Sequence, residues 1–163
     1  MLFEATDWGY PTSIWFGSER ARDLPVACRT LAVSRPLLVT DEGLANLPVI
    51  DELVAMLSGA GLNVAVFSGV QGNPTSTNVA AGVAALRQGG CDGVVAVGGG
   101  SALDVGKTVA LVARQEEPLW RFADMSAEPV ILAQDALVPV IALPTTAGTG
   151  SEVGRAAVIL DEE

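Results

Sequence analysis

The chain has no histidine among its 163 residues, which restricts the chemistry it can perform. Imidazole is the commonest metal ligand and the usual general acid or base near neutral pH. The two cysteines, Cys28 and Cys91, lie far apart and form no C-x-x-C pair. The sequence therefore predicts no metal site and no catalytic residue in this chain. Separated thiols, without a secretory signal, also favour a reducing, cytoplasmic compartment.

Aromatic side chains, positive charge and long apolar runs are scarce as well. Half of the residues are apolar but only 5% are aromatic, which predicts an aliphatic, alanine-rich core. The net charge of −10 argues against nucleic acid or an anionic membrane surface as a partner. No apolar run approaches the length of a membrane-spanning helix. We expect one domain, residues 1–163, with a single continuous core.

Short apolar segments alternate with segments of helical periodicity. Strands are expected at residues 36–41, 63–67, 93–97, 138–143 and 156–160, with a short edge strand or hairpin at 12–17. Helices are expected at residues 18–30, 49–57 and 101–113, and after a cap at Thr75 or Ser76. The strand runs are continuous rather than alternating, as in strands covered on both faces. The pattern predicts an α/β fold with a doubly wound, mostly parallel, Rossmann-like sheet.

The feature most typical of ligand binding is a glycine turn, Gly98, Gly99 and Gly100 followed by Ser101. A β-branched run that leads into these glycines suits a strand end, a tight turn and a helix start capped by Ser101. The free N–H groups and the positive end of the helix dipole favour a phosphate or pyrophosphate. A purely structural turn would explain the same glycines.

Two better-known phosphate loops do not fit the spacing. A P-loop that ends at Gly106, Lys107 and Thr108 requires glycine where Ser101 stands. A G-x-G-x-x-G fingerprint that starts at Gly98 requires glycine where Leu103 stands. The turn is therefore neither a P-loop nor a standard Rossmann loop.

A second loop, residues 144–152, is rich in hydroxyl groups and glycine and directly follows an expected strand. Parallel strands end at the same edge of a sheet, and ligands bind outside that edge in open α/β folds. We expect residues 98–101 and 145–151 to form two walls of one crevice.

Together, GGGSALDVGK at 98–107 and PTTAGTGSE at 144–152 resemble the iron-containing alcohol dehydrogenase family. Asp41 after its strand, and the turn Asn73, Pro74 and Thr75, match further family motifs in the same order. The resemblance spans nearly the whole chain, from about residue 14 to residue 160. It implies an N-terminal cofactor-binding domain for NAD or NADP.

The resemblance also implies roles for individual residues. Those that would hold the pyrophosphate are Gly98, Gly99, Gly100 and Ser101. Those that would line the cofactor beside it are Thr145, Thr146 and Thr149. Asn73 would lie near the same cleft, and Asp104 on its nicotinamide side. Turn formation and helix capping are the structural alternatives for these residues. Lys107 is expected to pair with an acid or to bond loop carbonyls.

Asp41 bears on which dinucleotide binds. A carboxylate at a strand end can accept hydrogen bonds from both adenosine ribose hydroxyls, but it would repel a 2′-phosphate. NAD is therefore favoured over NADP. Capping of the following turn by Asp41 is the structural alternative.

In that family a helical C-terminal domain supplies one Asp and three His for Fe(II) or another divalent metal. This chain contains no His and is expected to lack that domain. The resemblance implies an NAD-binding domain of a metal-dependent alcohol dehydrogenase that is inactive by itself. A cofactor domain like that of glycerol dehydrogenase or dehydroquinate synthase, and a stand-alone nucleotide-binding module, remain as alternatives. Expected partners are the dinucleotide, the missing domain and a second copy, through the strand at residues 13–16.

Overall fold

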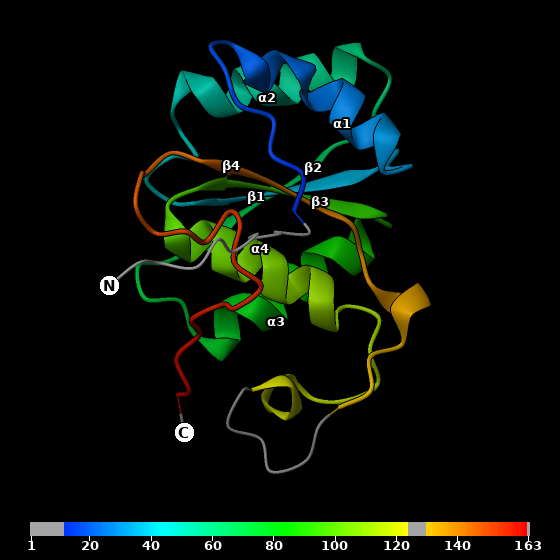
Figure 1. Ribbon diagram of the computed structural model, residues 1–163, viewed down its shortest axis with the longest axis vertical. Helices are drawn as coiled ribbons and strands as arrows, with labels where there is room; N and C mark the ends of the chain where they lie inside the picture. The colour runs from blue at the N-terminus through cyan, green and yellow to red at the C-terminus, as the bar shows by residue number, and fades with distance from the viewer. Residues whose placement is uncertain (1–11, 124–129, 163) are drawn as a thin grey trace, which may run out of the picture.

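The computed structural model describes residues 12–123 and 130–162 (Figure 1), and helices and strands alternate along these residues. The α-helices are α1 (Leu24–Thr30), α2 (Pro48–Gly59), α3 (Ser76–Gln88) and α4 (Gly100–Val112). The strands are β1 (Pro36–Asp41), β2 (Ala65–Val70), β3 (Gly93–Gly98) and β4 (Val140–Pro144). Three short 3-10 turns are η1 (Arg20–Asp23), η2 (Leu119–Phe122) and η3 (Gln134–Ala136).

All strand pairs are parallel, and the sheet order is β2-β1-β3-β4. The chain moves outward from β1 to β2 and then crosses to β3 on the other side of β1, so the winding direction reverses between β1 and β3. The carboxyl ends of two such strands leave a crevice in which ligands of open α/β sheets bind. Val39 of β1 pairs with Ala96 of β3, and this register brings Asp41 next to Gly98.

Helices cover both faces of the sheet. In Figure 1, α1 and α2 lie above it and α3 and α4 below. Neighbouring residues of one strand point to opposite faces: Val94 packs in the core with α3 and α4, and Val95 in the core with α1 and α2. Every residue of β3 is buried, as expected of a strand covered on both faces. The predicted doubly wound parallel fold is confirmed.

The helix α4 lies unusually close to the sheet. A Cβ atom added at Gly106 would stand 2.6 Å from the Cβ of Ala96 in β3. Only a residue without a side chain permits this separation, because real Cβ atoms do not approach so closely. The close contact fixes the position of the α4 N-terminus relative to the end of β3.

The predicted strand at the N-terminal end is wrong. Residues 13–16 belong to no helix or strand in the described part of the chain. The predicted start of the first helix at residue 18 is also wrong, because Glu19 takes a left-handed conformation with φ of 62° and η1 begins only after it. A conformation of that kind cannot continue a right-handed helix.

The last predicted strand, residues 156–160, is reduced to one bridge between Leu160 and Thr75. The Leu160 amide donates to the Pro74 carbonyl at 2.8 Å, and the Ser76 amide donates to the Leu160 carbonyl at 3.2 Å. These residues therefore lie against the start of α3, away from the sheet. No helix in the described residues has both the length and the apolar character needed to cross a membrane.

Candidate functional site

The glycine turn joins β3 to α4 at the point where the winding direction reverses. Gly98 ends the strand with φ of 147°, a conformation that favours glycine. Gly99 is the N-cap of α4, so Ser101 is the second helical residue and the predicted Ser101 cap is wrong. No side chain caps this helix. Because the first N–H groups of an α-helix lack partners within the helix, the α4 N-terminus presents donors and partial positive charge.

The loop at residues 144–152 packs directly against the glycine turn. The Thr145 amide donates to the Gly98 carbonyl at 2.9 Å. A Cβ added at Gly99 would stand 3.2 Å from Thr146 Oγ1, and one at Gly100 would stand 3.4 Å from Thr149 Cγ2. The predicted side-by-side arrangement of turn and loop is confirmed. The three threonines are exposed at this edge of the sheet.

Two hollows flank the α4 N-terminus, and Gly100 and Ser101 line both. The first, named the β1 hollow, has a volume of about 380 Å³. Its other lining residues are Asp41, Glu42, Gly43, Val70, Gln71, Gly72, Gly99 and Ala102. No sequence motif indicated Glu42, Gln71 or Gly72, which become neighbours of the glycine turn only through the sheet order.

The second, named the α3 hollow, has a volume of about 450 Å³. Its other lining residues are Asn73, Pro74, Asp104, Thr149, Gly150, Ser151, Gly154, Ala156, Val158 and Leu160. Seven of the ten predicted site residues thus line at least one hollow. The remaining three, Gly98, Thr145 and Thr146, lie in the turn and the loop that bound them.

Asp41 serves both the turn after β1 and the β1 hollow. Its Oδ1 accepts a hydrogen bond from the Leu44 amide at 2.9 Å. Its Oδ2 lies 3.0 Å from the position that a Cβ of Gly98 would occupy. Asp41 Oδ1 therefore caps the turn, as the structural alternative predicts, while Oδ2 faces the glycine turn.

Asp104 and Lys107 form an ion pair at 3.1 Å on the first turns of α4. The Ser151 hydroxyl donates to Asp104 Oδ1 at 2.6 Å, and the Val158 amide donates to Oδ2 at 3.0 Å. Lys107 also donates to the carbonyls of Gly154 and Ala156. Both expectations for Lys107, a paired acid and bonded loop carbonyls, are confirmed.

Asn73 lies in the turn before α3 and has a left-handed backbone with φ of 53°. Asparagine tolerates this conformation better than most residues. The predicted cap at Thr75 is confirmed, since Thr75 and Asn78 form a capping box in which Asn78 Oδ1 accepts from the Thr75 amide at 3.0 Å. The turn thereby brings Asn73 to the rim of the α3 hollow.

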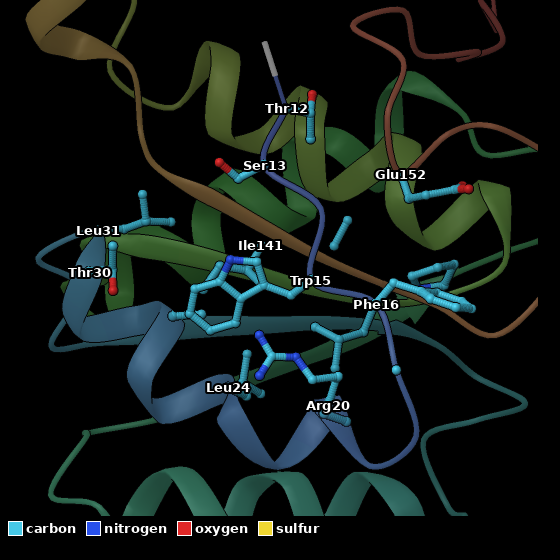
Figure 2. Close-up of a pocket in the computed structure, with 16 residues that line it drawn as sticks. Thr12, Ser13, Trp15, Phe16, Arg20, Leu24, Thr30, Leu31, Ile141 and Glu152 are labelled. Atoms are coloured by element: carbon cyan, nitrogen blue, oxygen red, sulfur yellow. The ribbon is translucent and has the colours of Figure 1, made fainter. Parts of the chain in front are cut away.

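A third hollow, named the N-terminal hollow, lies between residues 12–17, α1 and β4 and has a volume of about 430 Å³. Figure 2 shows the Trp15 ring near Arg20, whose guanidinium carbon lies 5.0 Å from the ring centroid. Leu24 and Ile141 add apolar lining. None of the predicted site residues lines this hollow, and no sequence motif indicated it.

The crevice between the ends of β1 and β3, where the winding direction reverses, and the uncapped N-terminus of α4 define an α/β domain of the Rossmann-like class. The family profile described as iron-containing alcohol dehydrogenase matches residues 11–163, and the chain belongs to this family.

Individual relatives agree with this assignment. The chain is 42% identical to 4-hydroxybutyrate dehydrogenase from Cupriavidus necator, a match covering 82% of this chain and 34% of the relative. A crystal structure of 1,3-propanediol oxidoreductase superposes with a TM-score of 0.85 at 36% identity, covering 98% of this chain and 40% of that one. The crystal structure of sulfoacetaldehyde reductase from Bifidobacterium kashiwanohense in complex with NAD+ superposes with a TM-score of 0.83 at 31% identity. This match covers 98% of this chain and 41% of the reductase. The chain therefore spans roughly two fifths of the length of these relatives.

The metal that the family name implies finds no fitting ligand set among the residues that the structure describes. The sequence contains no histidine, and the described residues hold no group of three or more His, Cys, Asp or Glu side chains placed to bind an ion. Cys28 and Cys91 are buried and unpaired. Burial, and then the nearby Asp92 carboxylate, raises the pKa of both thiols, which disfavours the thiolate that a metal requires.

Proposed function

We propose that the chain binds NAD at the glycine turn and is the cofactor-binding part of an alcohol dehydrogenase that interconverts alcohols and aldehydes by hydride transfer. The observation that carries this proposal is the uncapped N-terminus of α4 with a hollow on either side. A pyrophosphate held by these amides leaves one hollow for each nucleoside. When bound, NAD supplies the hydride acceptor. The NAD+ complex of the sulfoacetaldehyde reductase supports the same ligand class.

The residues fit a dinucleotide because glycine at positions 98–100 puts no side chain between a phosphate and the first N–H groups of α4. Gly98 also allows the tight junction between β3 and α4, since a Cβ there would stand 2.7 Å from the Ala102 Cβ. We assign the pyrophosphate to Gly98, Gly99, Gly100 and Ser101. Thr145, Thr146 and Thr149 form the wall beside it. Asn73 and Asp104 line the hollow assigned to the nicotinamide nucleoside.

Asp41 and the β1 hollow are assigned to the adenosine ribose, with NAD preferred over NADP. The lining of the β1 hollow contains two carboxylates, Asp41 and Glu42, and no Lys or Arg. A 2′-phosphate would meet like charge there, whereas ribose hydroxyls would find acceptors.

Hydride transfer by these 163 residues alone is not expected. The metal site does not fit the residues present, and the two hollows contain no imidazole. We also propose a cytoplasmic location, which the free cysteines support.

Self-association through residues 13–16 is proposed as a second property. The side chains of Ile14 and Phe16 are 64% and 95% exposed. Exposed apolar side chains that lie close together often mark a protein–protein contact. A second copy of the chain would cover them.

Calorimetric titration with NAD and NADP tests the proposed function. We expect NAD to bind, NADP to bind more weakly, and Fe(II) or Zn(II) to change neither affinity. Absence of NAD binding would contradict the proposal. Metal-dependent alcohol oxidation by the purified chain would contradict the expected inactivity.

A further inference from the structure

Lys107 is the only lysine of the chain, and its ammonium group has three acceptors. It lies 3.1 Å from Asp104 Oδ1 and donates to the carbonyls of Gly154 and Ala156 at 3.2 and 2.5 Å. Its side chain is 16% exposed, so little water replaces any acceptor that is lost. A lysine ammonium has three donors, and all of them are accounted for.

Asp104 extends the same network to two further points of the chain. Its Oδ1 accepts from the Ser151 hydroxyl at 2.6 Å, and its Oδ2 accepts from the Val158 amide at 3.0 Å. Two residues one helical turn apart on α4 therefore hold positions 151, 154, 156 and 158. Figure 1 shows this red segment running along α4.

The held segment has no regular secondary structure of its own. Residues 151–158 form turns and bends and join no strand. Four of these residues, Ser151, Gly154, Ala156 and Val158, line the α3 hollow, whereas Lys107 does not line it. The shape of this wall therefore depends on the ion pair, of which Asp104 also lines the hollow and Lys107 does not.

We propose that Lys107 and Asp104 are positioning residues that fix the 151–158 wall for the nicotinamide nucleoside. This inference depends on the proposed function, because it takes the pyrophosphate to lie at Gly100 and Ser101. Asp41 then holds the adenosine in the β1 hollow, and the nicotinamide nucleoside occupies the α3 hollow. Lys107 acts on the cofactor only through the wall.

A comparison of NAD with ADP, which lacks the nicotinamide nucleoside, distinguishes this positioning role from an effect on the stability of the whole domain. ADP fills the β1 hollow and the pyrophosphate position but leaves the α3 hollow empty, whereas NAD needs both hollows. Calorimetry of both ligands against wild type and Lys107→Met is the test. We expect the Kd for NAD to rise about tenfold, the size of change typical of residues that act through a network, and the Kd for ADP to stay within about twofold.

Arg87→Met is the matched control. Arg87 also joins two elements, since its guanidinium donates to the Ala113 carbonyl at 2.9 Å, but at the far end of α4. We expect this variant to bind both ligands as wild type does. Lys107→Arg, which keeps a cation beside Asp104, should recover most of the NAD affinity.

Equal losses for NAD and ADP in Lys107→Met, or no loss of either, would overturn the positioning role. If Lys107→Met does not fold, the Ser151→Ala variant tests the positioning role instead, because it removes one contact to Asp104 and leaves the ion pair intact. This variant should raise the Kd for NAD about threefold and leave the Kd for ADP unchanged. An unchanged Kd for NAD would overturn the inference. Failure of wild type to bind either ligand would instead refute the proposed function.

Discussion

The two carboxylate oxygens of Asp41 have different surroundings, and this difference shapes the test of cofactor preference. Oδ1 accepts from the Leu44 amide, while Oδ2 faces Gly98 in the β1 hollow. In Asp41→Gly both functions are lost. In Asp41→Asn an acceptor for Leu44 remains and only the charge is removed.

Both variants should shift preference toward NADP, because the like charge that opposes the 2′-phosphate is gone. We expect the ratio of Kd values, NADP to NAD, to fall about tenfold in Asp41→Gly, in which ribose acceptors are lost as well. Competition binding with both cofactors measures the ratio. An unchanged ratio in both variants would assign Asp41 to the turn alone.

Among the helices, α4 depends most on close contact with the sheet. Gly106→Ala would place a methyl group 2.6 Å from the Ala96 Cβ, so we expect a loss of about 1–3 kcal/mol in the free energy of unfolding. Gly59→Ala, at the end of α2, meets no atom within 4 Å and should gain about 0.5–1 kcal/mol. Urea denaturation measures both. Equal effects of the two substitutions would contradict the packing described for α4.

The starts of β1 and β3 are joined by Asp92. Its carboxylate accepts from the Ser34 hydroxyl at 2.6 Å and from the Ser34 and Arg35 amides at 3.0 and 2.7 Å. Partial burial acts to raise the pKa of Asp92, but these hydrogen bonds outweigh it and the pKa is lowered.

A lowered pKa means that the ionised carboxylate stabilises the folded state. The contribution is therefore present above the pKa of the unfolded chain, about 3.9, and is lost as the pH falls through the lower folded value. Asp92→Asn should cost about 1–2 kcal/mol at pH 7 and less in acid. Urea denaturation of wild type and variant at pH 7 and pH 3 compares the two losses. A loss that is the same at both pH values would show that the charge is not responsible.

For the molecule as a whole, the exposed residues near its N-terminal end predict self-association. Phe16→Ser removes the apolar side chain that is 95% exposed and should shift a dimer toward monomer. Light scattering after size-exclusion chromatography measures the mass. Val26→Ser, which removes an apolar side chain 44% exposed on α1, is the control and should leave the mass unchanged. A wild-type chain that is monomeric at all concentrations would contradict the proposal.

Most of the sheet and its ligand-binding edge could be predicted because their sequence signals are local. Four strands with continuous apolar runs, the glycine turn and the small residue at Gly106 each follow from a few neighbouring residues. The register between β1 and β3 then brings Asp41 to Gly98. Local propensity was therefore sufficient wherever burial on two faces determined the structure.

The structural predictions were wrong where contacts between distant residues determine the backbone conformation. Residues 156–160 have a β-branched apolar pattern, but Lys107, Asp104 and the start of α3 hold this segment away from the sheet. Ser101 is a residue type favoured as an N-cap, yet Gly99 takes that position because the helix begins two residues earlier than the hydroxyl suggested. Such contacts join residues from 49 to 86 positions apart or depend on exact backbone geometry, and single-sequence patterns contain neither.

The assignment of the pyrophosphate can be tested at the atoms that would bind it. Titration of the ¹⁵N-labelled chain with NAD, followed by amide chemical shifts, reports on each N–H group separately. We predict that the largest shifts occur at Gly99, Gly100, Ser101 and Ala102, at the start of α4. Saturable binding of NAD that leaves these four amides unshifted would contradict the proposed site.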